Sequence, residues 1–206
     1  MLRTLGDAPG FAGSRNRSFF GILLATGCRV NALRLLDGSH CVAMPNGRLR
    51  IYLHEKGKGE RREVELSRKA AVELHDYAEA FNESAAPRSP RSLVRLGECG
   101  SVWRNTRGQP WGYTSILHVL EDGCQRAGVA SFTPHALRRA FATDAASQLP
   151  RHVVACAGGW SGLERLDDHY VGTRERTIWE KLSGTGHPGV MSGFEEEVTG
   201  AATVAV

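Results

Sequence analysis

A histidine and an arginine stand three residues apart at the start of a predicted helix. The segment 133–139 has the sequence TPHALRR, in which Thr133 is a favoured helix cap and Pro134 a favoured first helical residue. His135 and Arg138 then share one face of the first turn. Free backbone N–H groups and the positive end of the helix dipole attract anions to that turn. The segment therefore predicts a phosphate site, and a capped helix with incidental polar residues is the open alternative.

Arg29 follows the sequence ATGC at residues 25–28, where an apolar segment ends abruptly. The planar guanidinium group of an arginine matches a phosphate through two parallel hydrogen bonds. An arginine just past a glycine can equally be fixed at a buried turn by a carboxylate. Taken alone, the position of Arg29 favours this structural role over phosphate binding.

Lys58 lies between two glycines in a charged loop. Such a lysine is usually a solvated turn residue, and the functional alternative is a mobile cation that protonates the leaving oxygen of a phosphodiester. The chain contains no G-x-x-x-x-G-K-[ST] pattern, so Lys58 does not belong to a nucleotide-binding P-loop.

Tyr170 follows Trp160 by ten residues near the end of the predicted domain. A late tyrosine is most often a packing residue, and a phenol with a pKa of about 10 is a poor nucleophile unless cations stabilise the phenolate. The arginines and the histidine upstream could supply that positive charge. A covalent nucleophile is therefore the functional alternative for Tyr170.

Alternating apolar and polar residues predict two strands that form a hairpin. Leu49, Ile51 and Leu53 alternate with polar residues, and Val64 and Leu66 do so again after the charged glycine loop. The loop between the two strands carries the lysine described above.

The remaining elements that would position these residues are helices. Residues 15–26 form an apolar helix that ends at Gly27, and Ser67 is a good cap for a helix whose apolar face includes Leu74. Further helices are predicted over 114–127, from 134 onward, and over 150–157, 163–170 and 174–182. The predicted fold class is α+β and mainly α-helical, a helical bundle with a small antiparallel sheet on one side.

The composition is that of an intracellular globular protein. Of the 206 residues, 41% are hydrophobic and 23% charged, and the length suits one domain with a core. The net charge of +4 supports nucleic-acid binding only weakly. Five widely spaced cysteines without a C-x-x-C pair argue against disulfides or a zinc site and favour a reducing cytoplasm. No apolar run is long enough to span a bilayer and no signal peptide is recognisable, so we expect no membrane partner.

Taken in order, these segments resemble the catalytic domain of the tyrosine recombinase, or phage integrase, family. The resemblance covers about residues 15–182. Five elements carry it: TGCR at 26–29, GKGERR at 57–62, TPHALRRAFAT at 133–143, GGW at 158–160 and, last, Tyr170. The element at 133–143 is the most specific of the five.

The resemblance implies cleavage and rejoining of DNA. Tyr170 would attack a backbone phosphate and form a 3′-phosphotyrosine, with release of a 5′-hydroxyl. Arg29 and Arg138 would hold the non-bridging oxygens, where charge builds up in the transition state. No metal, nucleotide or other cofactor is expected, because the phosphotyrosine bond conserves the energy of the phosphodiester.

Three further side chains receive roles from the same resemblance. Lys58 would protonate the leaving 5′-oxygen, and His135 would act as acid or base toward the tyrosine. Trp160 would donate its indole N–H to the phosphate. The lysine loop is one residue shorter than the common form, so Lys56 competes with Lys58 for the role of general acid.

One residue type and one further spacing differ from the family pattern. The family often has an acidic residue three positions after the first arginine, where this chain has Ala32 beside Asn31. Support for Arg29 must then come from elsewhere in the fold. The separation between Trp160 and Tyr170 is also one residue longer than usual, which a single insertion before the tyrosine helix would absorb.

The domain organisation follows from the extent of the resemblance. We expect a loose leader over 1–14, the catalytic domain over 15–182, and a C-terminal tail over 183–206 that is mobile or docks on a partner. An N-terminal core-binding domain, which would close a clamp around the duplex, is expected to be missing.

The predicted partners are double-stranded DNA and further copies of the chain in a synaptic tetramer. The predicted location is the cytoplasm, on the nucleoid when DNA is bound. Two alternatives use the same fold: a strand transferase like the type IB topoisomerases, which shares the catalytic side chains, and a non-catalytic DNA-binding relic.

Overall fold

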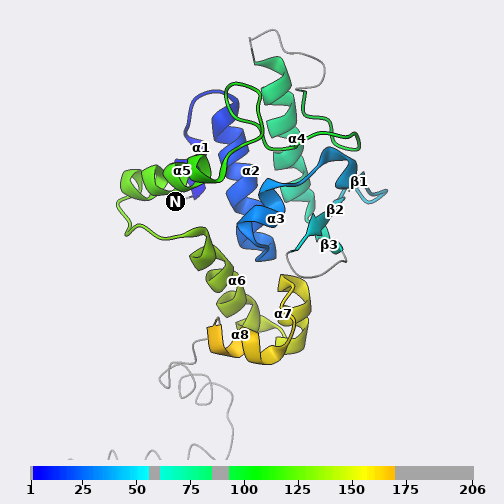
Figure 1. Ribbon diagram of the computed structural model, residues 1–206, viewed down its shortest axis with the longest axis vertical. Helices are drawn as coiled ribbons and strands as arrows, with labels where there is room; N and C mark the ends of the chain where they lie inside the picture. Colours follow the sequence, from blue (N-terminus) through cyan, green and yellow to red (C-terminus); the bar gives the residue numbers. More distant parts are fainter. Residues whose placement is uncertain (1, 56–60, 85–92, 170–206) are drawn as a thin grey trace, which may run out of the picture. The chain divides into compact units, whose positions relative to one another are not determined.

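The computed structural model describes residues 2–55, 61–84 and 93–169 (Figure 1). The chain divides into two units, and all of the described residues belong to the first, Met1–Val171. The predicted helix over 174–182 and the tail over 183–206 lie outside the described residues.

The described part of the chain is mostly helical, with one small sheet. Its elements in order are α1 (Leu2–Gly6), α2 (Phe11–Thr26), α3 (Val30–Arg34), β1 (Cys41–Ala43), β2 (Leu49–His54), β3 (Arg61–Leu66), α4 (Arg68–Glu83), α5 (Tyr113–Arg126), α6 (Pro134–Gln148), α7 (Arg151–Gly158) and α8 (Leu163–His169). The fold class is therefore α+β and mainly helical, as the sequence predicts.

The sheet has three antiparallel strands in the order β1-β2-β3. In the β2–β3 hairpin Leu49 lies opposite Leu66 and His54 opposite Arg61. The apolar residues of β2 alternate inward as expected. The sequence did not predict β1, because three residues are too few to show a period.

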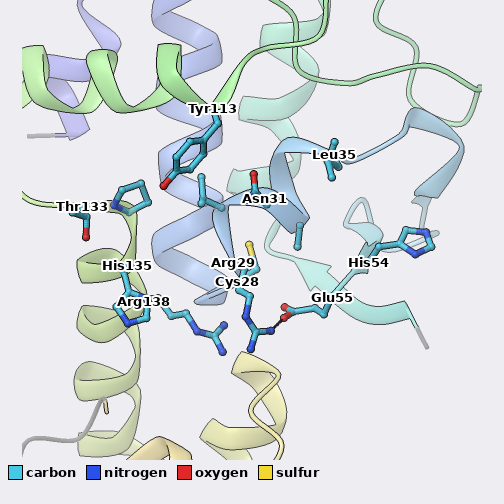
Figure 2. A pocket seen from close by; sticks show the side chains of 13 residues that line it. Cys28, Arg29, Asn31, Leu35, His54, Glu55, Tyr113, Thr133, His135 and Arg138 are labelled. Carbon is cyan, nitrogen blue, oxygen red and sulfur yellow. Dashed lines mark hydrogen bonds and ion pairs between the residues drawn. The ribbon is translucent and has the colours of Figure 1, made fainter. Parts of the chain in front are cut away.

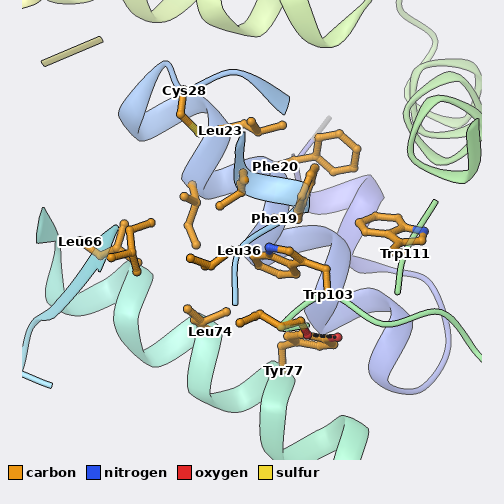
Figure 3. Packing of buried hydrophobic residues seen from close by; sticks show 14 of the residues in the cluster. Phe19, Phe20, Leu23, Cys28, Leu36, Leu66, Leu74, Tyr77, Trp103 and Trp111 are labelled. Carbon is orange, nitrogen blue, oxygen red and sulfur yellow. Dashed lines mark hydrogen bonds between the residues drawn. The ribbon is translucent and has the colours of Figure 1, made fainter. Parts of the chain in front are cut away.

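The core is built around α2. Phe19 packs edge to face against Trp103 and Trp111, with ring centroids 5.0 and 5.1 Å apart (Figure 3). Leu74 and Tyr77 bring α4 into the same cluster, along the length of α2. This packing fixes the C-terminal end of α2, from which the chain enters the candidate site.

The expected leader over 1–14 is corrected by the structure. This segment contains α1 and the start of α2, and it buries Leu5 and Phe11 in the core. The Phe11 ring lies 4.9 Å from that of Phe81, edge to face. The sequence shows no helical period here because α1 has only five residues. After α1 the chain turns back sharply, and a Cβ atom on Gly13 would lie 2.4 Å from the carbonyl oxygen of Gly6.

A second, smaller hydrophobic cluster joins α6, α7 and α8. Its buried members are Ala142, Val154, Ala155, Trp160 and Leu166. Because Trp160 belongs to this cluster, the packing of the last three described helices determines where its indole lies.

Candidate active site

The turn after α2 places Arg29. Gly27 adopts a left-handed conformation with φ of 58°, and its N–H bonds to the carbonyl of Leu23. A Cβ atom at Gly27 would lie 2.2 Å from the ring of Phe141 on α6. Both the conformation and the close approach of α6 therefore require glycine. The chain then leaves the turn with Arg29 at the position that precedes α3.

Helix α6 begins at Pro134, as the sequence predicts. The side chain of Thr133 makes no capping hydrogen bond, so the start of the helix depends on the proline and on tertiary packing. The first turn carries an exposed His135 and a buried Arg138.

Arg138 ties three segments together. Its guanidinium group donates hydrogen bonds to the carbonyl of Gly27 at the end of α2 and to that of Gly158 at the end of α7, the latter at 2.7 Å. Its Cζ atom also lies 4.0 Å from the centroid of the Trp160 ring. The cation is thus held by carbonyl dipoles and by an aromatic face, both of which favour positive charge.

Trp160 is fixed by its neighbours. The residue follows Gly159, which has φ of 71° and ends α7. A Cβ atom on Gly158 would lie 1.8 Å from the Trp160 ring, so the ring packs directly on that glycine. Phe141 stacks on the indole with an interplanar angle of 14°. The two glycines before Trp160 therefore have a structural purpose that the sequence motif alone does not reveal.

Three of the predicted site residues line one cavity of about 690 Å³: Arg29, His135 and Arg138. Figure 2 shows the two guanidinium groups pointing toward the same space, with the imidazole beside them on α6. The other side chains come from the α2–α3 turn, the end of β2 and the start of α5, and include Cys28, Asn31, His54, Glu55 and Tyr113. The two guanidinium groups and the imidazole are donors that can hold a tetrahedral anion.

Glu55 is a member of the site that motif analysis missed. Its carboxylate is buried and pairs with Arg29 through one oxygen and with the Nε atom of Arg62 through the other, the latter at 3.3 Å. Continuing the alternation of β2 by one residue puts Glu55 on the same inward face as Leu53. A carboxylate at an inward position of a strand was the signal that could have revealed it.

Arg62 extends this network across the site. It donates hydrogen bonds to the carbonyl of Thr26 on α2, at 3.4 Å, and to that of Ala157 on α7. Burial lowers the pKa of Arg62 below its ordinary value, and the nearby charge of Arg29 lowers it further.

The other predicted residues are outside the part of the chain that the structure describes. Lys58, its competitor Lys56 and the nucleophile Tyr170 all fall there. Within residues 2–55, 61–84 and 93–169, no group of three or more His, Cys, Asp or Glu side chains could hold a metal ion. No helix in the same ranges has the length and apolarity needed to cross a membrane.

The fold and the site together define a class of protein. A mainly helical domain brings two arginines and a histidine to one cavity beside a β-hairpin, and a tryptophan packs against one of these arginines. Such an arrangement is suited to a phosphate group, because Arg29 and Arg138 are already held in place by protein contacts.

The chain belongs to the Phage integrase family, whose match extends over residues 4–176. A tyrosine recombinase XerD of Rhizobium meliloti (strain 1021) is 35% identical over 158 residues, which cover 75% of this chain and 43% of that protein. A XerD of Mycobacterium leprae (strain TN) is 31% identical over 130 residues, which cover 63% and 39%. The chain thus spans about two fifths of the length of these curated relatives.

Solved structures share the fold. The XerA recombinase matches with a TM-score of 0.67 at 17% identity, over 90% of this chain and 62% of that one. The XerH site-specific recombinase, bound to its difH substrate after cleavage, gives 0.65 at 21% identity, over 87% and 50%. The catalytic domain of bacteriophage HP1 integrase gives 0.55 at 16% identity, over 91% and 89%.

Proposed function

We propose that this chain is the catalytic part of a site-specific DNA recombinase, which cleaves and rejoins strands through a covalent 3′-phosphotyrosine at Tyr170. One observation carries the proposal: Arg29, His135 and Arg138 line a single cavity although more than 100 residues separate Arg29 from the other two. A cavity of this kind in a member of the integrase family supports phosphoryl transfer to a protein side chain.

In the proposed reaction, the phenolic oxygen of Tyr170 forms a bond to phosphorus while the bond from phosphorus to the 5′-oxygen breaks. Arg29 and Arg138 balance the charge on the non-bridging oxygens. Lys58, or Lys56 in its place, gives a proton to the leaving oxygen. Rejoining reverses these steps, so that no external energy source is needed.

His135 and Trp160 complete the proposed machinery. The imidazole is exposed on the first turn of α6 and lines the cavity, and in the proposed reaction it exchanges a proton with the tyrosine. The indole is held against the Arg138 guanidinium by Phe141 and Gly158, so its N–H is placed by the same contacts that fix the arginine.

The proposed partner is double-stranded DNA, bound by several copies of the chain that assemble into a tetramer. Solved relatives of the same fold were captured on DNA, among them the Tn1549 transposon integrase with transposon right end DNA. A role in integration of a mobile element, and a location in the cytoplasm on the nucleoid, belong to the same proposal. The two curated relatives described above are named tyrosine recombinases, which favours recombination over relaxation of supercoils by a topoisomerase-like enzyme or over a non-catalytic relic.

Covalent capture tests this function. A pool of duplexes with randomised sequence around a nick, placed so that cleavage cannot reverse, is incubated with the protein and analysed on denaturing gels. We expect the wild type to form an adduct that Tyr170→Phe cannot form, and sequencing of the captured DNA would give a cleavable duplex. A wild type without an adduct, or a phenylalanine variant that still forms one, would refute the assignment.

A further inference from the structure

We infer that Glu55 is a positioning residue for the reaction: its buried carboxylate orients Arg29 toward the scissile phosphate and joins it to Arg62. The inference rests on the proposed function. Arg29 needs a supporting carboxylate, and Ala32 does not provide one. Glu55, the residue directly after β2, would supply that support.

The Glu55 carboxylate lies in the protein interior and the Arg29 side chain reaches the cavity. The Glu55 side chain is only 3% exposed, whereas that of Arg29 is 47% exposed and lines the cavity. One partner is thus fixed in the protein interior and the other reaches into the cavity. An arginine has five N–H donors in a rigid fork, so a bond to Glu55 leaves others for a phosphate.

The positions nearest to Arg29 do not offer a substitute. Ala32 is buried and lines the same cavity, but it carries only a methyl group. The side-chain oxygen of Asn31 accepts a hydrogen bond from the Nε atom of Arg34 at 3.0 Å, so it is turned to another partner. In the part of the chain that the structure describes, Glu55 is the carboxylate paired with Arg29.

The second oxygen of the carboxylate links Arg29 to the frame of the site. Through Arg62, it is connected to the end of α2 and to the end of α7, the helix that precedes Trp160. Arg29 and Arg62 also repel one another at this junction, and the negative charge of Glu55 offsets part of that repulsion. Removing the charge would leave a largely buried Arg62 without its ion-pair partner, which is costly.

The test measures single-turnover cleavage at saturating protein on the duplex obtained by covalent capture. Glu55→Gln keeps the shape and removes the charge, and Glu55→Asp keeps the charge and shortens the reach. Glu65→Gln is the matched control, because Glu65 pairs with Arg48 at 2.8 Å on the same hairpin but does not line the cavity. We expect Glu55→Gln to lower the cleavage rate constant by up to about 100-fold, Glu55→Asp to lower it less, and Glu65→Gln to match the wild type.

A second substrate separates positioning from a general loss of structure. In a methylphosphonate duplex, an uncharged methyl group replaces one non-bridging oxygen of the scissile phosphate, so a correctly oriented Arg29 has less charge to balance. The defect of Glu55→Gln should therefore be smaller on the methylphosphonate than on the phosphate. Thermal unfolding of each variant is measured in parallel. If Glu55→Gln does not fold, the comparison of the two substrates is made with Glu55→Asp.

Three outcomes would overturn the inference. These are an unchanged rate constant in Glu55→Gln, an equal defect on both substrates, and a Glu65→Gln variant as impaired as Glu55→Gln. They are distinct from failure of the proposed function, in which the wild type itself forms no covalent adduct.

Discussion

Arg138 is firmly held by its neighbours. It is 3% exposed, donates to two backbone carbonyls from different helices, and lies against an aromatic ring. A group fixed in this way needs no reorganisation when a phosphate arrives, and such preorganisation is the main source of electrostatic catalysis. Arg138 therefore supports the fold, and in the proposed reaction the same contacts would hold it in place for the phosphate.

We expect Arg138→Lys to lower the cleavage rate constant at least about 100-fold, because an ammonium group cannot reproduce the guanidinium fork. The free energy of unfolding should also fall by about 1–3 kcal/mol, since the ammonium group cannot bond both buried carbonyls with the geometry of the guanidinium. Single-turnover cleavage and thermal unfolding measure the two effects. Arg139→Lys is the control, because Arg139 is the exposed neighbour on the same helix. An Arg138→Lys variant with the cleavage rate of its control would contradict this role.

Individual residues differ in how far the sequence could predict them. His135 and Arg138 share a turn, so local spacing was enough to bring them together, as the cavity shows. Glu55 and Arg62 act on groups 26 and 95 residues away in the chain, and no local pattern encodes such pairs. Residue types alone therefore suggested the anion site but not the carboxylate inside it.

Among the elements, the turn between α2 and α3 makes the site possible. Gly27 has a positive φ and meets Phe141 of α6 across the turn, so this one residue allows α2 and α6 to approach. The carbonyl of Gly27 is also an acceptor for Arg138. A displacement of this turn would move both arginines together.

Gly27→Ala is expected to lower the free energy of unfolding by at least about 2 kcal/mol, from the left-handed conformation and from overpacking against Phe141. Cleavage should be lost with it. Gly128→Ala is the matched control, since Gly128 also has positive φ, of 64°, but a Cβ atom there would meet nothing within 4 Å. Chemical denaturation of both variants measures the difference. If both variants lost the same free energy of unfolding, the left-handed backbone conformation alone, and not the approach of α6, would make Gly27 necessary.

The longer elements followed from sequence patterns, and the shorter ones did not. The Ser67 side chain caps α4 at the amide of Ala70, 3.2 Å away, and the helix buries the face that its period predicts. In contrast, α1 and β1 have only five and three residues, and tertiary contacts decide their conformation. Local periodicity is therefore a sufficient guide only where an element is long enough to repeat it.

For the chain as a whole, electrostatics sets the expected strength of DNA binding. The net charge is only +4, and the candidate site contains a buried carboxylate among its arginines. Most affinity for DNA comes from phosphate contacts that release counterions, so the number of such contacts limits affinity. A modest charge with a small cationic cavity therefore predicts weak binding that decreases steeply as salt is added.

We expect this 206-residue chain to bind duplex DNA with a Kd on the order of micromolar or weaker at physiological salt. The logarithm of the association constant should fall linearly with the logarithm of salt concentration, with a slope of about −0.9 for each phosphate contact. Arg29→Gln should reduce the magnitude of that slope by about 0.9, the value of one phosphate contact, because it removes a single cation from the phosphate site. Arg48→Gln is the control, since Arg48 is paired with Glu65 and does not line the cavity.

Fluorescence anisotropy of a labelled duplex over a range of salt concentrations measures both slopes and affinity. A nanomolar Kd at physiological salt would show that the chain makes many more phosphate contacts than its charge suggests. A slope that Arg29→Gln leaves unchanged would place the phosphate contacts outside the cavity. In that case the arginines would be structural in this chain, and the DNA-binding surface would have to be sought on other elements.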